Sequence, residues 1–177
     1  MRKIHFFLLF VLMAACSSCR EKLPTSGLPQ PAAMEAVPAE KFSDIQVPDL
    51  DRNAFSLMEE IGRNDVTVID FWASWCGPCR QEAPNLINIY HSYKEKGLGI
   101  IGISLDEEYD DWKAAVSQLG FAWPQVSELR GWDDAVARQY GVSAIPHTIV
   151  VARDGTILAR GLRGAELDAF IAKQFEK

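Results

Sequence analysis

Residues 70–79 read Asp-Phe-Trp-Ala-Ser-Trp-Cys-Gly-Pro-Cys, and they join two segments of different character. Before them lies the apolar run 66–72, which predicts a short strand buried on both faces. After them, apolar side chains recur at helical spacing for about 18 residues until Gly97 stops the pattern. Cys76 and Cys79 are therefore expected at the start of a helix that directly follows a buried strand.

The start of a helix gives a cysteine pair particular chemistry. Its unpaired amide N–H groups and positive dipole end favour a thiolate, so we expect a lowered pKa for Cys76. The i, i+3 spacing brings Cys79 within reach of Cys76, and a disulfide can close across one turn. Gly77 permits close approach of a partner backbone, and Pro78 fits a first turn because its missing N–H would be unpaired there. Trp75 is expected to form a large apolar lid beside the pair.

Three other interpretations compete with a redox pair: a zinc site, a structural disulfide and two buried thiols. Zinc requires about four ligands, and the second Cys-x-x-Cys, Cys16 and Cys19, lies in a region expected to be processed. A structural disulfide across so short a loop contributes little, because the stabilisation grows with loop size. The spacing favours a redox pair that carries the electrons itself, with no metal and no organic cofactor.

The chain beyond Gly97 alternates between strand-like and helix-like segments. The expected elements are a strand at 98–104, a helix capped by Asp110 or Asp111 and ended by Gly120, a short helix capped by Asp133 and ended by Gly141, strands at 148–152 and 156–160 around a turn, and a last helix through Leu167, Phe170 and Ile171. This order predicts an α/β fold, a three-layer sandwich with a central mixed sheet. The acidic stretch 106–111 lacks the pattern of a calcium loop and is expected to be a solvated helix start.

The N-terminus has the pattern of a targeting segment. Arg2 and Lys3 precede an apolar run that ends at Ala15, which is shorter than the roughly 20 residues of a membrane span and predicts a signal peptide over 1–15. The residues before Cys16 look like the cleavage box of bacterial lipoproteins, which implies lipidation of Cys16. Cys19 is a second candidate, and ordinary cleavage to a soluble product is the alternative.

Composition suggests how the rest of the chain is organised. Residues 20–41 are rich in proline and small residues, so 16–41 is expected to be a lipidated N-terminus and flexible linker before a domain at 42–177. The formal net charge of −6 becomes −8 once residues 1–15 are removed. Without a run of lysine and arginine beyond the first three residues, no nucleic-acid partner is expected.

Two motifs resemble the thioredoxin superfamily. Residues 70–79 resemble the active-site segment of thioredoxins, and residues 143–147, Ser-Ala-Ile-Pro-His, resemble the family's cis-proline loop. Residues 80–84, Arg-Gln-Glu-Ala-Pro, and the long stretch between the two motifs resemble the TlpA/ResA-like envelope branch. The resemblance covers about 42–177. It implies a thioredoxin fold and a periplasm-facing thiol:disulfide oxidoreductase, with disulfide-bearing envelope proteins as substrates and a membrane thiol donor upstream.

The resemblance also implies roles for residues outside the cysteine motif. Asp70 matches the buried acid that assists proton transfer, and burial in an apolar strand would raise its pKa towards neutral pH. Pro146 matches the cis-proline, which leaves the Ile145 backbone free to pair with a substrate chain. His147 and Glu82 are possible modulators. The alternatives are a solvent-facing Asp70, a trans Pro146 in a turn, and ordinary surface charge at Glu82.

Two other functions are considered beside disulfide reduction. A peroxiredoxin-like peroxidase shares the fold, but its motif has threonine three residues before the nucleophilic cysteine, where this chain has Ala73. A non-catalytic module could hold extended peptides in the cis-proline groove, although intact Cys76 and Cys79 argue against it. Gly77-Pro78 is the dipeptide of reducing thioredoxins, so we expect the protein to work as a reductase.

Overall fold

The computed structural model describes residues 40–176. The expected signal peptide, Cys16 and all of the linker before Glu40 lie outside the described residues. Glu40, the first described residue, already pairs with the domain: its carbonyl accepts from the N–H of Ile157 at 2.9 Å, and the N–H of Phe42 donates to the Gly155 carbonyl at 2.7 Å. Within the described part of the chain, this pairing includes residues before the expected boundary at residue 42.

A five-stranded mixed sheet forms the middle of the domain. Its strand order is β5-β4-β3-β6-β7, with β3, β4 and β5 parallel and β6 and β7 antiparallel to their neighbours. The strands are β3 (Val66–Trp72), β4 (Leu98–Ser104), β5 (Gln125–Val126), β6 (His147–Ala152) and β7 (Ile157–Arg160). Strands β3 and β4 have the bounds that their apolar runs predict. The predicted α/β fold with a central mixed sheet is confirmed.

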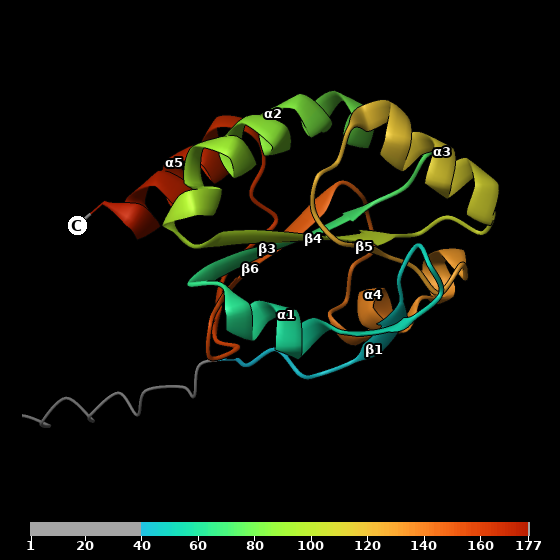
Figure 1. Ribbon diagram of the computed structural model, residues 1–177, viewed down its shortest axis with the longest axis horizontal. Helices are drawn as coiled ribbons and strands as arrows, with labels where there is room; N and C mark the ends of the chain where they lie inside the picture. Colours follow the sequence, from blue (N-terminus) through green and yellow to red (C-terminus); the bar gives the residue numbers. More distant parts are fainter. Residues whose placement is uncertain (1–39, 177) are drawn as a thin grey trace, which may run out of the picture. The chain divides into compact units, whose positions relative to one another are not determined.

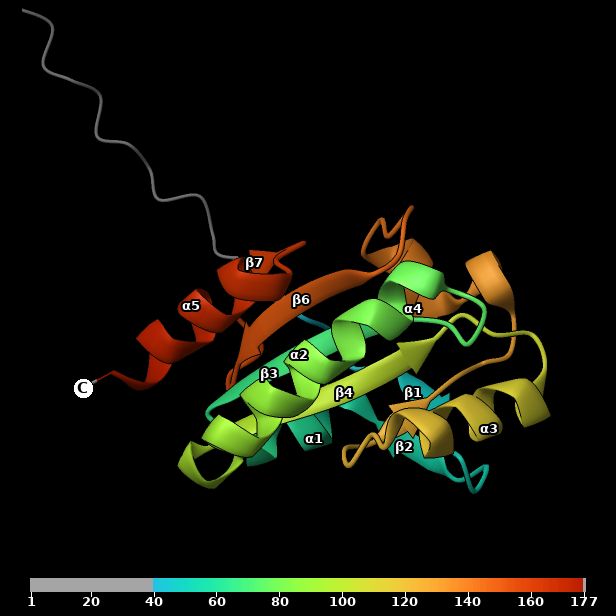
Figure 2. The ribbon, with the colours of Figure 1, turned by 90° about the horizontal axis from the view of Figure 1, so that it is seen from above.

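Helices cover both faces of the sheet and complete the three layers (Figure 1). Helices α2 and α5 lie on one face, and α1 and α4 lie on the other. Figure 2 shows α2 lying over β3 and β4. Helix α3 lies beside the start of α2, where Arg80 donates to Gln118 at 3.3 Å. The helices are α1 (Leu57–Arg63), α2 (Gly77–Tyr93), α3 (Tyr109–Leu119), α4 (Ala135–Gln139) and α5 (Gly164–Phe175), with 3-10 turns η1 (Lys94–Lys96) and η2 (Gly131–Asp133). Among the described residues, no helix combines the length and apolarity that a membrane span requires.

Strand alternation divides the core into two layers. Val68 and Ile100 pack with Leu86 and Ile89 of α2 on one face of the sheet. The odd-numbered positions of β3 and β4 face the other way, where they pack with α1 and α4. Asp70 therefore shares the α2 face with Val68, whereas Phe71 points to the opposite face.

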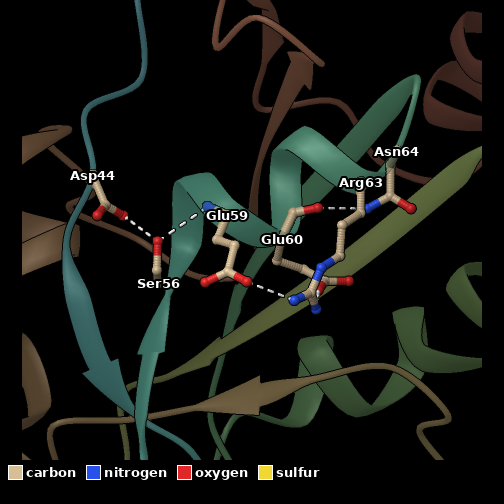
Figure 3. A network of polar contacts seen from close by, with 6 residues as sticks. All are labelled: Asp44, Ser56, Glu59, Glu60, Arg63 and Asn64. Carbon is tan, nitrogen blue, oxygen red and sulfur yellow. Dashed lines mark hydrogen bonds and ion pairs between the residues drawn. The ribbon is translucent and has the colours of Figure 1, made fainter.

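The N-terminal hairpin and helix α1 have no counterpart in the sequence analysis. Strands β1 (Gln46–Pro48) and β2 (Ala54–Ser56) are three residues each, too short to show a period. Ser56 caps α1 by accepting from the N–H of Glu59 at 3.0 Å, and its hydroxyl donates to Asp44 at 2.8 Å (Figure 3). The charges of Glu59, Glu60 and Arg63 pair along the exposed side of the helix.

Two expected helix caps are wrong by one or more residues. Glu108 precedes α3, and Asp110 and Asp111 lie inside the first turn of the helix. Their carboxylates interact favourably with the helix dipole there but do not cap the helix. Helix α4 is capped by Asp134, whose carboxylate accepts from the N–H of Ala137 at 2.9 Å, and not by Asp133. Helix α3 thus has no side-chain cap at Glu108, whereas Asp134 caps α4 through its carboxylate.

The topology brings several chain segments together at one edge of the sheet. Strands β3 and β4 are parallel and end there, at Trp72 and Ser104. Strand β6 runs antiparallel to β3 and begins there, with His147 opposite Phe71. The cysteine motif, the loop after β4 and the cis-proline loop consequently share this edge.

Candidate active site

Cys76 and Cys79 form a disulfide at the start of α2. The two Cα atoms are 5.3 Å apart and the sulfurs are 1.97 Å apart. Cys76 is the N-cap of the helix, and its Sγ accepts from the N–H of Cys79 at 3.2 Å. Pro78 lies in the first turn, as predicted. Both cysteines are 5 % exposed, so exposure does not distinguish them, whereas the N-cap position places the helix dipole at Cys76.

Asp70 is buried within β3, three per cent exposed, on the face that α2 covers. Burial raises the pKa of its carboxyl to about 7, and the nearby charge of Glu82 contributes in the same direction. The solvent-facing alternative for Asp70 is therefore wrong. A carboxyl with this pKa exchanges its proton at neutral pH, which suits a proton acceptor for a thiol.

Glu82 connects α2 to the start of α5. Its Oε1 accepts from the backbone N–H of Gly164 at 2.7 Å and from the amide of Asn85 at 2.8 Å. Helix α5 has no side-chain cap of its own at Arg163, so the Glu82 carboxylate satisfies a first-turn N–H from another element. Glu82 is thus half-buried and held, unlike a freely solvated surface charge.

The Ile145–Pro146 peptide bond is cis. Pro146 and Pro78 line one shallow hollow of about 320 Å³ beside the disulfide, together with Glu82 and Arg163. The cis-proline loop and the cysteine motif therefore meet, as the resemblance implies. Ile145 is partly buried and packs against the core.

His147 occupies the first position of β6, opposite Phe71. Residues directly opposite each other on antiparallel strands share a face, so His147 lies on the face away from Asp70 and α2. Burial lowers the pKa of its imidazole, and the neighbouring charges of Arg160 and Arg163 lower it further. His147 is accordingly a neutral side chain at pH 7, on the side of the sheet opposite α2.

The loop that carries Trp75 is anchored by Asp106, although the acidic pattern of residues 106–111 predicts a solvated helix start there. That interpretation is wrong for Asp106, which is 1 % exposed. Its carboxylate accepts from the N–H of Ser74 at 3.0 Å, the Ser74 hydroxyl at 2.5 Å and the Ser104 hydroxyl at 2.6 Å. The one available signal was its position at the end of β4, on the same edge as the motif.

No cluster of three or more His, Cys, Asp or Glu side chains with a metal-binding arrangement occurs within residues 40–176. Residues 38–160 match the model of the AhpC/TSA family. The chain belongs to the AhpC/TSA family. In this member of the family, a Cys76–Cys79 disulfide lies at the start of α2.

Curated relatives of this AhpC/TSA protein are named as thiol–disulfide oxidoreductases or thiol:disulfide interchange proteins. It is 32% identical over 112 residues to the thiol-disulfide oxidoreductase ResA of Bacillus thuringiensis, a match that covers 63% of this chain and 62% of ResA. It is 31% identical over 111 residues to the thiol:disulfide interchange protein HelX of Rhodobacter capsulatus, covering 63% and 59% of the two chains. The chain thus spans less than two thirds of the length of these curated relatives. The predicted resemblance is confirmed.

Solved structures support the same fold. The thioredoxin domain of a thiol-disulfide oxidoreductase from Bacteroides vulgatus matches with a TM-score of 0.71 at 32% identity, over 78% of this chain and 97% of that domain. A thiol-disulfide oxidoreductase from Bacteroides fragilis matches with a TM-score of 0.71 at 29% identity, over 76% and 99% of the two chains. The thioredoxin fold expected from the motifs is confirmed.

Proposed function

We propose that this AhpC/TSA family protein is a thiol:disulfide oxidoreductase that reduces disulfides in envelope proteins. The observation that carries the proposal is the Cys76–Cys79 pair at the start of α2. Asp70, whose carboxyl has a pKa of about 7, lies on the face of the sheet that α2 covers. The names of the relatives support the reaction class. Ala73, where a peroxiredoxin motif has threonine, favours disulfide reduction over peroxide reduction within this family.

The reaction begins with the reduced protein. The Cys76 thiolate, stabilised by the N–H of Cys79 and the helix start, attacks one sulfur of the substrate disulfide. A bond forms between Cys76 and that sulfur, the substrate S–S bond breaks, and the other substrate sulfur leaves as a thiolate that takes a proton from water. The cis-proline loop supports this step by presenting the Ile145 backbone to an extended substrate chain.

The second step releases the reduced substrate. Asp70 accepts the proton of the Cys79 thiol, and the Cys79 thiolate attacks the Cys76 sulfur. The mixed disulfide breaks, the second substrate sulfur leaves as a thiolate, and the Cys76–Cys79 disulfide of the structure remains. Two electrons have then passed to the substrate. A membrane thiol carrier would return the protein to its reduced form.

We further propose a place for the protein in the cell envelope. The pattern of residues 1–15 supports a signal peptide, and the following box supports lipidation of Cys16. Residues 16–41 would then tether the domain 42–177 to the membrane while leaving it able to reach its partners.

Reduction of insulin disulfides by dithiothreitol tests the reaction. The protein should accelerate insulin precipitation, and Cys76→Ser should abolish the acceleration. A hydrogen peroxide assay with the same preparations separates the peroxidase alternative. Peroxide turnover without insulin reduction would reject the proposed function.

Expression of the full chain in a bacterial host tests the anchor. The wild-type protein should fractionate with membranes and carry a lipid mass at Cys16, whereas Cys16→Ala should not. Cys19→Ala is the matched control, because it removes the neighbouring cysteine and leaves the box intact. Membrane association that survives Cys16→Ala would reject lipidation there.

A further inference from the structure

The two exposed tryptophans of the domain lie in one groove next to the disulfide. Three large apolar side chains are exposed among residues 40–176: Trp75 at 58%, Trp132 at 47% and Leu158 at 37%. Trp75 and Trp132 both line a groove of about 280 Å³, and Trp75 directly precedes Cys76. Tryptophan is among the residue types enriched at binding hot spots, so two of them beside the reacting sulfur mark a contact surface.

The groove carries negative charge and no positive side chain. Its remaining lining includes Asp106, Glu107, Glu108 and Asp111, and no lysine, arginine or histidine lines it. Asp106 is occupied by Ser74 and Ser104. Within the described part of the chain, Glu107, Glu108 and Asp111 are exposed and form no ion pair with lysine, arginine or histidine.

Tertiary contacts hold the Trp75 wall of the groove in place, and a close approach of backbone to side chain shapes the Trp132 wall. The Trp75 wall follows Ser74, which Asp106 fixes through its backbone N–H and its hydroxyl. The Trp132 wall follows Gly131, which has φ +56° and lies so close to Glu107 that a Cβ there would be 2.7 Å from the carboxylate oxygen. Only glycine allows this approach without displacing Glu107. The Trp75 side of the groove is therefore fixed before binding, which lowers the entropic cost of binding.

We propose that this groove receives a lysine- or arginine-bearing segment that flanks the attacked cysteine of the partner protein. The charged head would pair with Glu107, Glu108 or Asp111, and its aliphatic stem would lie against the faces of Trp75 and Trp132. Charge complementarity and continuity with the redox disulfide specify this occupant. The inference rests on the proposed disulfide exchange and adds the chemistry by which a partner is chosen.

Synthetic peptides with one internal disulfide test the preference. Three versions carry lysine, serine or glutamate at the two positions that flank the first cysteine, and they are otherwise identical. The pre-reduced protein is mixed with excess peptide, acid-quenched and alkylated, and its oxidation is followed by mass. The lysine peptide should react about 5- to 20-fold faster than the serine peptide, because a cation–π contact and one or two exposed ion pairs together contribute that much. The glutamate peptide should be slowest, and 0.5 M NaCl should shrink the differences.

Variants test whether the groove causes the preference for the lysine peptide. The double variant Glu107→Gln, Glu108→Gln should reduce the ratio between lysine and serine peptides to below about twofold. The double variant Glu95→Gln, Asp168→Asn removes the same charge at η1 and on the exposed side of α5, and should keep the ratio. Trp132→Ala should lower it, and Trp132→Phe should retain most of it. Equal wild-type rates, or a ratio that survives in the Glu107 and Glu108 variant, would overturn the proposal.

A binding measurement separates this proposal from the proposed function. Peptides with serine in place of both cysteines are titrated into the oxidised protein, and the indole N–H signals are followed by NMR. If no disulfide peptide oxidises the reduced wild-type protein, the proposed function fails, and the titration alone decides about the groove. Tighter binding of the lysine peptide that is lost in the Glu107 and Glu108 variant supports the groove, and equal binding of all peptides rejects it.

Discussion

Asp70 shows how a single residue couples stability to chemistry. Its carboxyl has an ordinary pKa of 3.8 and a pKa of about 7 in the folded chain, because burial and the charge of Glu82 disfavour ionisation. Between these values the folded chain binds a proton that the unfolded chain has released, so the free energy of unfolding falls as pH rises. The pKa difference corresponds to about 4 kcal/mol, a cost that is complete above pH 7.

Asp70→Asn should remove that cost, because asparagine resembles the protonated carboxyl in shape and carries no charge. We expect the oxidised variant and wild type to have similar unfolding free energies at pH 4, and the variant to be more stable by up to about 4 kcal/mol at pH 8. Urea denaturation at both pH values measures this. The same variant should slow release of reduced substrate near pH 7. An equal rate across pH 6–8 would mean that Asp70 accepts no proton in the reaction.

Glu82 affects the active site through its charge. Glu82→Gln keeps an oxygen that can accept from the N–H of Gly164 and removes the negative charge that raises the pKa of Asp70. The pH midpoint of the substrate-release step should therefore move to lower pH. Stopped-flow measurement across pH 5–9 gives this midpoint, and Glu166→Gln on α5 is the control. An unmoved midpoint would leave Glu82 with a capping role alone.

At the scale of the element, the first turn of α2 distinguishes two cysteines of equal exposure. Cys76 occupies the N-cap and its sulfur accepts from the N–H of Cys79, so the dipole end favours the Cys76 thiolate. With less than one equivalent of iodoacetamide, the reduced protein should be alkylated at Cys76 first. Peptide mass mapping measures the ratio, and the urea-unfolded chain, where the two should label equally, is the control. Preferential labelling of Cys79 would reverse the roles.

Across the whole domain, the arrangement of charges is expected to influence the redox potential of the Cys76–Cys79 couple. A more stabilised Cys76 thiolate would make the couple more oxidising. The helix start stabilises the thiolate, but His147 is neutral and lies on the other face of the sheet, and Asp70 and Glu82 add negative charge on the α2 side. These features favour a reducing couple.

Equilibration with glutathione should give a potential more negative than about −180 mV, outside the range of isomerases and oxidants. His147→Ala should leave the potential within about 10 mV, which is about a twofold change in the equilibrium constant. A potential above −180 mV would mean that electrons flow in the opposite direction.

Features that depend on residues close together in the chain could be predicted from the sequence. Continuous apolar runs predicted β3 and β4, because a strand that is buried on both faces is apolar along nearly its whole length. Spacing and turn chemistry placed Cys76 and Cys79 at the start of α2, and the resemblance located the cis Pro146. The hairpin β1–β2 could not be predicted, because strands of three residues have no measurable period.

The polar groups that share the active-site edge are brought together by the tertiary structure. Within one acidic stretch it buries Asp106 under the loop of Ser74 and leaves Glu107 exposed, a difference that composition cannot express. It brings Glu82 to the N–H of Gly164, 82 residues away, and Trp132 to the groove of Trp75. The physical reason is that strand order and direction set these contacts. Parallel β3 and β4 end at one edge, and antiparallel β6 begins at the same edge.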